Sequence, residues 1–185
     1  MDNQQFDPFE RFSELQSQAF AASAACGRDR EFHDRIAAML QPDSGQSEAA
    51  LRLLLWRPPP TALDFLEGVF LNAVDGTPGL GVSMARSLLR GLPKEQVDER
   101  LDAVLPGLLA QLNSDHVTSL SSILVEFGMI RHLPTVADWL ESNGPPEDQA
   151  IAVRLRNNPR APAFWRRSPE DIARQKEGRA PGVSG

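Results

Sequence analysis

Two consecutive stretches of this chain, residues 101–127 and 129–155, carry the same residues at several positions, at an offset of 28. The recurring positions are a Leu-Pro step, a leucine, a serine and an isoleucine: Leu105-Pro106 with Leu133-Pro134, Leu112 with Leu140, Ser114 with Ser142, and Ile123 with Ile151. A period near 30 residues is typical of stacked helix pairs, in which each unit buries its apolar face on its neighbours. Because such stacks act through a surface, the repeat predicts an architecture and a kind of function together.

The apolar residues recur at helical spacing along most of the chain. In the range 94–113 they follow the i, i+3, i+4 rhythm of an amphipathic helix, at Val97, Leu101, Val104, Leu105, Leu108, Leu109 and Leu112. No segment alternates as a strand would. Helix start signals such as Asp7-Pro8 and Thr61-Ala62-Leu63-Asp64 help to place the helices. We expect helices at about 8–25, 28–41, 46–56, 61–75, 79–91, 94–113, 115–127, 130–142 and 147–157, and a short one at 169–176.

The predicted connections between these helices are short, so consecutive helices should pack as antiparallel hairpins. The sequence therefore predicts an all-α fold, a short curved stack of antiparallel helix pairs with an N-terminal helical cap. Pro106 and Pro134 fall inside predicted helices, where each would remove a backbone hydrogen bond and kink the first helix of its pair. Kinks at the same phase of successive units would make the stack curve.

The predicted organisation is one folded domain in three segments. Residues 1–57 form the N-terminal helical cap packed on the repeats, and residues 58–158 form the helix-pair repeats. Residues 159–185 form a linker, the short helix and a flexible basic tail, since loop-forming residues cluster at its start and small residues at its end.

The junction between the two clearest units resembles a known repeat. The segment from Phe127 to Val136 resembles the short HEAT-like repeats first noted in phycobilisome lyases, in which a glycine ends one repeat and an arginine and a proline follow in the next. Gly128, Arg131 and Pro134 match these positions, whereas Met129 stands where those repeats often have an acid. The resemblance covers roughly residues 60–158 and implies a HEAT-like α-solenoid.

Charge is unevenly distributed along the chain, whose formal net charge is −6. Residues 1–57 carry −3, residues 58–158 carry −6, and residues 159–185 carry +3. An acidic body repels phosphate backbones, so we expect no nucleic acid partner. It suits a basic partner protein, and one helix would present an acidic face that is either solvated or bound by such a partner: Glu95, Asp98, Glu99 and Asp102.

The chain also lacks the marks of membrane or secretory targeting. No apolar run is long enough to span a bilayer, and the first residues lack the basic start and apolar stretch of a secretory signal. One cysteine excludes an internal disulfide framework and is compatible with a reducing compartment. Arginine outnumbers lysine 17 to 2, which is typical of a GC-rich bacterial genome. We expect a cytoplasmic bacterial protein.

No catalytic, cofactor-binding or metal-binding pattern stands out. None of His33, His116 and His132 lies four residues from another, as a helical metal pair requires. Cys26 has no evident base and orienting partner. The glycines of 76–81 lack the preceding strand and the lysine of a phosphate loop. We therefore predict no catalytic residue, no cofactor and no metal.

Trp165 lies away from every apolar stripe, beside Phe164, Arg166 and Arg167. Its surroundings fit two interpretations. The aromatic pair could fold back and cover the open end of the last helix pair, as an end repeat requires. Alternatively, Trp165 and the arginines could form an exposed anchor for a partner, since Trp and Arg dominate binding hot spots.

The predicted binding residues follow from the resemblance, in which the second helix of each pair lines the inner surface. It implies contact residues on 115–127 and 147–157, to which the aromatic–arginine segment is added: Ser119, Ser122, Glu126, Arg154, Arg156, Trp165, Arg166 and Arg167.

These observations predict a non-catalytic module that binds another protein through an acidic, curved helical surface. An adaptor or accessory subunit and an immunity-type inhibitor of a toxin both fit, because acidic helical stacks suit basic targets. The alternative is an enzyme that uses a HEAT-like scaffold, such as a lyase-type or nucleic-acid-processing protein.

Overall fold

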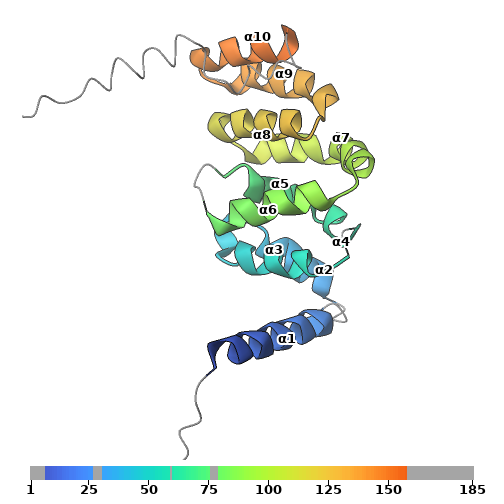
Figure 1. Ribbon diagram of the computed structural model, residues 1–185. Coiled ribbons are helices and arrows are strands. Elements are labelled where there is room, and N and C mark those ends of the chain that lie inside the picture. Colours follow the sequence, from blue (N-terminus) through green and yellow to red (C-terminus); the bar gives the residue numbers. More distant parts are fainter. Residues whose placement is uncertain (1–6, 27–30, 59, 76–78, 158–185) are drawn as a thin grey trace, which may run out of the picture. The chain divides into compact units, whose positions relative to one another are not determined.

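The computed structural model describes residues 7–26, 31–58, 60–75 and 79–157, and every regular element within these ranges is helical, which confirms the all-α class (Figure 1). The predicted helix at 169–176 lies outside them. The helices are α1 (Pro8–Cys26), α2 (Phe32–Met39), α3 (Ser47–Leu55), α4 (Pro60–Leu63), α5 (Leu66–Ala73), α6 (Leu80–Gly91), α7 (Lys94–Gln111), α8 (Ser114–Glu126), α9 (Leu133–Asn143) and α10 (Gln149–Asn157).

The chain divides into two compact units, residues 1–110 and 111–185. In the first unit α6 packs against both α3 and α5, and α2 packs against α3 (Figure 1). In the second unit α9 packs against both α8 and α10. The boundary falls at the end of α7, inside the range 58–158 that the sequence analysis assigned to a single run of helix pairs.

The predicted helix at 61–75 is wrong as one element, because it breaks between α4 and α5 at Asp64 and Phe65. Ala62 and Leu63 at the end of α4, Phe65 in the break and Leu66 at the start of α5 are all buried. A continuous helix turns about 100° per residue, so these four side chains would lie within an arc of about 160°, as on an amphipathic helix. The spacing of the apolar residues therefore gives no sign of the break. Thr61, predicted as the N-cap, lies inside α4.

Two N-terminal caps show what fixes helix starts. Asp7 caps α1 as predicted, and its carboxylate accepts hydrogen bonds from the backbone N–H of Phe9 and Glu10 at 2.8 and 3.4 Å. At α8 the capping residue is Asn113, whose side-chain oxygen accepts from the N–H of His116 at 2.9 Å. The helix therefore begins at Ser114 rather than at 115.

Gly128 ends α8 with a Schellman motif. It has φ 70°, in the left-handed region, and its N–H donates to the carbonyl of Val125. The next N–H, that of Met129, donates to the carbonyl of Leu124 at 2.7 Å, and the Met129 side chain is buried. The carbonyls of Leu124 and Val125, which have no partner within the helix, thus accept hydrogen bonds. The glycine that was matched to the end of a repeat does end a helix here.

The two prolines of the repeated Leu-Pro step lie in different places. Pro106 is inside α7, whereas Pro134 is in the first turn of α9, where its missing N–H would have no helical partner. A kink in the helix interior at Pro134 was therefore wrongly predicted. The matched leucines also lie in different places, since Leu112 follows α7 whereas Leu140 lies within α9. Both side chains are buried, as predicted.

Replacing Gly128 by alanine is expected to lower the free energy of unfolding by about 1–2 kcal/mol, because a Cβ is disfavoured in the left-handed region. Chemical denaturation followed by circular dichroism measures the change. Gly91→Ala is the matched control: its Cβ would meet nothing within 4 Å at the end of α6, so stability should be unchanged or raised by up to about 1 kcal/mol. Equal losses in both variants would contradict the Schellman assignment.

Truncating Leu140 to alanine is expected to cost about 2–5 kcal/mol, because the side chain is fully buried in α9. Val153→Ala, at a half-exposed position of α10, should change stability by no more than about 0.5 kcal/mol. The same denaturation assay compares the two. A surface-like effect at Leu140 would show that the packing of α9 is misassigned.

Candidate functional site

The predicted contact residues on α8 are less accessible than expected. Ser119 and Ser122 are both half-buried rather than outward-facing. The Ser122 hydroxyl donates to the carbonyl of Thr118 in the preceding turn at 3.1 Å, so it is used within the helix. Glu126 is exposed in the last turn of α8. Of the three, Glu126 alone presents its side chain chiefly to solvent.

The two predicted arginines of α10 have different surroundings. Arg156 bridges two carboxylates of α9: it pairs with Asp138, and its Nη1 lies 2.5 Å from Oε1 of Glu141. The hydrogen bonds to Asp138 and to Glu141 raise the pKa of Arg156 above its ordinary value, so it stays positive throughout the neutral range. Arg156 therefore ties α10 to α9. Arg154 is exposed. Trp165, Arg166 and Arg167 lie outside the described residues.

The largest exposed apolar side chains lie on α1. Phe9, Phe12 and Phe20 are 83%, 61% and 63% exposed, and Leu15 is 48% exposed. Phe9 and Phe20 are about three helical turns apart and share one side of the helix, with Phe12 adjacent one turn on from Phe9. Aromatic side chains in this number are normally buried in a soluble domain. This apolar face of α1 is therefore a candidate binding surface.

The C-terminal end of α1 is held by the rest of the first unit. Arg57 donates from Nη2 to the carbonyl of Ser23 at 2.9 Å, and Ser23 is buried. The guanidinium carbon of Arg57 lies 5.2 Å from the ring centroid of Phe32, and Phe32 meets Phe65 edge-on at 6.2 Å. The Arg57 Nε is buried without a hydrogen-bond partner in the structure as described. One end of α1 is thus anchored while its phenylalanines stay exposed.

The sequence predicts a helix at 8–25 within a packed cap, but the phenylalanines of this helix are not among the predicted contact residues. Their helical spacing was a usable signal, because it defines an apolar face once the helix is assumed. What the spacing cannot reveal is whether another element covers that face. Of the helices in the predicted cap, α3 packs against α6, whereas the apolar face of α1 is exposed.

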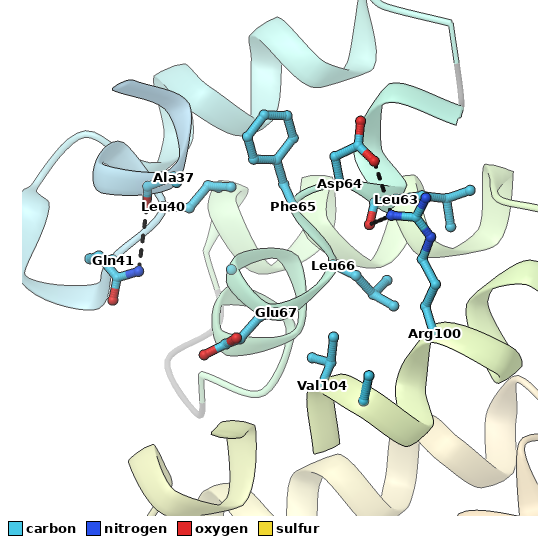
Figure 2. Close-up of a pocket in the computed structure, with 12 residues that line it drawn as sticks. Ala37, Leu40, Gln41, Leu63, Asp64, Phe65, Leu66, Glu67, Arg100 and Val104 are labelled. Atoms are coloured by element: carbon cyan, nitrogen blue, oxygen red, sulfur yellow. Dashed lines mark hydrogen bonds and ion pairs between the residues drawn. The ribbon is translucent and has the colours of Figure 1, made fainter. Parts of the chain in front are cut away.

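A pocket of about 510 Å³ opens in the first unit where the break between α4 and α5 faces α2 and α7 (Figure 2). Its lining is mainly apolar and includes Leu40, Phe65, Leu66 and Val104. Gly68 brings α5 close to α2, since a Cβ there would lie 2.7 Å from the Cβ of Leu40. The volume is in the range of small-molecule sites.

The polar edge of this pocket is organised by Arg100 of α7. Its Nη1 donates to the carbonyl of Leu63 at 3.0 Å and to the Asp64 carboxylate at 2.9 Å (Figure 2). The Leu63 carbonyl lost its helical partner at the break, so Arg100 supplies the missing donor. The Arg100–Asp64 ion pair thus lies at the edge of a pocket whose lining is mainly apolar and also includes Glu67.

The described residues contain no group of three or more His, Cys, Asp or Glu side chains able to hold a metal ion. Among the same residues, no helix combines the length and apolarity needed to cross a bilayer. Cys26 is exposed at the end of α1, and His132 is buried.

Comparison of the chain with family models, with curated proteins and with solved structures finds no match. The resemblance to HEAT-like repeats stays a prediction based on the residues of the 127–136 junction.

Replacing Arg100 by glutamine is expected to destabilise the protein more than replacing Asp64 by asparagine, because only Arg100 also serves the Leu63 carbonyl. Both side chains are about half exposed, so their coupling energy in a double-mutant cycle should stay below about 1 kcal/mol and fall further in 1 M salt. Denaturation of the four variants measures it. A larger cost at Asp64 would contradict this role of Arg100.

Proposed function

We propose that this chain is a non-catalytic protein-binding module of a bacterial cytoplasm, acting as an adaptor, an accessory subunit or an immunity-type inhibitor. The observation that carries the proposal is the apolar face of α1, with Phe9, Phe12 and Phe20 each more than half exposed. Contiguous apolar surface of this kind marks interaction sites on soluble proteins. An amphipathic helix with its apolar face uncovered is suited to bind in a groove of a partner.

The size of the face supports this proposal. Three phenylalanines at these exposures present on the order of 400 Å² of apolar surface. At about 25 cal/mol per Å², covering it would contribute roughly 10 kcal/mol, which is comparable to the cost of association. The face is also about half of what one partner contributes to a standard interface. Polar contacts around it would supply the rest.

The surface predicted on α8 and α10 offers a weaker anchor. Its serines are half-buried, and Arg156 is already bound to α9. Glu126 and Arg154 remain exposed there and could add rim contacts. We keep the HEAT-like stacking of helix pairs as part of the proposal. The contacts of α5 with α6 and of α9 with α10 support helix pairs as the building unit.

The double variant Phe9→Ser/Phe12→Ser is expected to lose capture of the partner from a lysate of the source organism by at least ten-fold, because it removes apolar contact area. Its melting temperature should change little, since both side chains are exposed in the free protein. Quantitative mass spectrometry of the captured proteins measures the loss.

Leu80→Ser is the control, because Leu80 is half-exposed at the start of α6 and lies outside the apolar face of α1. It should leave capture unchanged. Equal capture by the wild-type chain and the Phe9/Phe12 variant would refute a binding role for α1. Recovery of a bound small molecule with no partner protein would count against the module as a whole.

A further inference from the structure

We infer that the partner of α1 is a different protein, with an apolar groove that receives the phenylalanines and a basic rim along one side of the helix. The inference rests on the proposed binding role and adds the chemistry of the partner. It depends on the charged side chains that lie beside the apolar face. It also depends on whether the charge of a second copy or of a lipid surface would match them.

The charged side chains of α1 are predominantly acidic. Residues 7–26 contain Asp7, Glu10 and Glu14 and the single base Arg11. Arg11 is already paired within the helix, since its Nη1 lies 2.6 Å from Oε2 of Glu14. Asp7 is used as the N-cap. Glu10 and Glu14 are one turn apart on the same side of α1, and both are exposed.

These two carboxylates flank the apolar face on the side of Phe9 and Phe20, where a helix lying in a groove meets the rim. An interface gains orientation and association rate when potentials across its rim are opposite in sign. Glu10, Glu14 and the paired Arg11 together carry one net negative charge, so a rim of lysine or arginine facing them meets that condition. An acidic rim would place like charges opposite one another.

A second α1 does not meet the condition. The chain carries a formal charge of −6, so association of two copies brings acidic surfaces together. The second α1 would offer only Arg11 as a cation, and that group is bound to its own Glu14.

A lipid surface fits α1 no better. Helices that lie in the membrane interface typically carry lysine and arginine on the polar face, which attract anionic headgroups. The polar side of α1 has the opposite balance, with two acids and one base in the helix and Asp7 as its N-cap. Of these three surfaces, a second α1, a lipid surface and a protein groove with a basic rim, the groove is the one whose charge matches.

The test begins with a photo-crosslinking side chain at Gln16, an exposed position of α1 beside Phe9, Phe12 and Phe20. The full-length chain is irradiated in a lysate of the source organism, and the crosslinked protein is identified, purified and titrated by calorimetry. The same crosslinker at exposed Gln96 of α7 gives the background. Finding no product above that background overturns the inference.

The decisive comparison is between two charge reversals. Glu10→Lys/Glu14→Lys is expected to weaken binding of the purified partner at least ten-fold in 50 mM salt, and the difference should shrink in 300 mM salt. Glu95→Lys/Glu99→Lys is the matched control: it has the same spacing, also starts in the first turn of its helix, and lies on exposed residues of α7. It should leave the affinity within two-fold.

The possible outcomes distinguish the basic rim of the partner from the proposed binding role of α1. Loss of binding in Phe9→Ser/Phe12→Ser with no effect of the Glu10/Glu14 reversal overturns the basic rim and leaves the proposed function standing. Equal weakening of binding by both charge reversals also overturns the basic rim, because the net charge of the chain alone would then explain the loss of affinity. Binding of the chain to vesicles containing phosphatidylglycerol, or a dimer in sedimentation velocity that Phe12→Ser dissociates, assigns the face to lipid or to a second copy and overturns the inference.

Discussion

The first unit is organised around the break between α4 and α5, where Ala62, Leu63, Phe65 and Leu66 are all buried. The break frees the Leu63 carbonyl, which Arg100 satisfies, and leaves the apolar pocket between α2, α5 and α7. The buried ring of Phe65 supports Phe32, Phe32 lies against Arg57, and Arg57 holds the end of α1. The presentation of α1 is therefore linked, contact by contact, to the buried ring of Phe65 at the break.

The second unit is organised differently, by well-defined helix ends. Asn113 caps α8 at its start, and Gly128 closes it with a left-handed turn that buries Met129. Pro134 then lies in the first turn of α9. With these boundaries fixed, Asp138 and Glu141 of α9 lie one turn apart and share Arg156 of α10. The cation expected at a binding surface instead joins two helices, because two fixed carboxylates of its own chain are within reach.

The proposed function follows from a contrast between these features. Arg100 at the pocket and Arg156 of α10 are hydrogen-bonded within the chain, whereas no part of the chain that the structure describes covers the apolar face of α1. Anchoring one end of the helix through Ser23 limits its freedom before a partner arrives, which reduces the entropy that binding must overcome. The acids beside the face then discriminate among possible partners by charge.

The sequence by itself determined the all-α class, most helix positions and the buried positions Leu112 and Leu140, because helical periodicity and capping residues are local signals. It also determined the N-cap at Asp7 and the helix end at Gly128, where backbone chemistry is decided by neighbouring residues. Only the tertiary structure decided the break at Asp64, the ion pairs of Arg156 and the pocket beside Arg100. Each depends on groups distant in the sequence that compete for the same burial or the same hydrogen bonds. The exposure of the phenylalanines on α1 belongs with these, because periodicity defines an apolar face but only the packing of the other helices decides whether that face is covered.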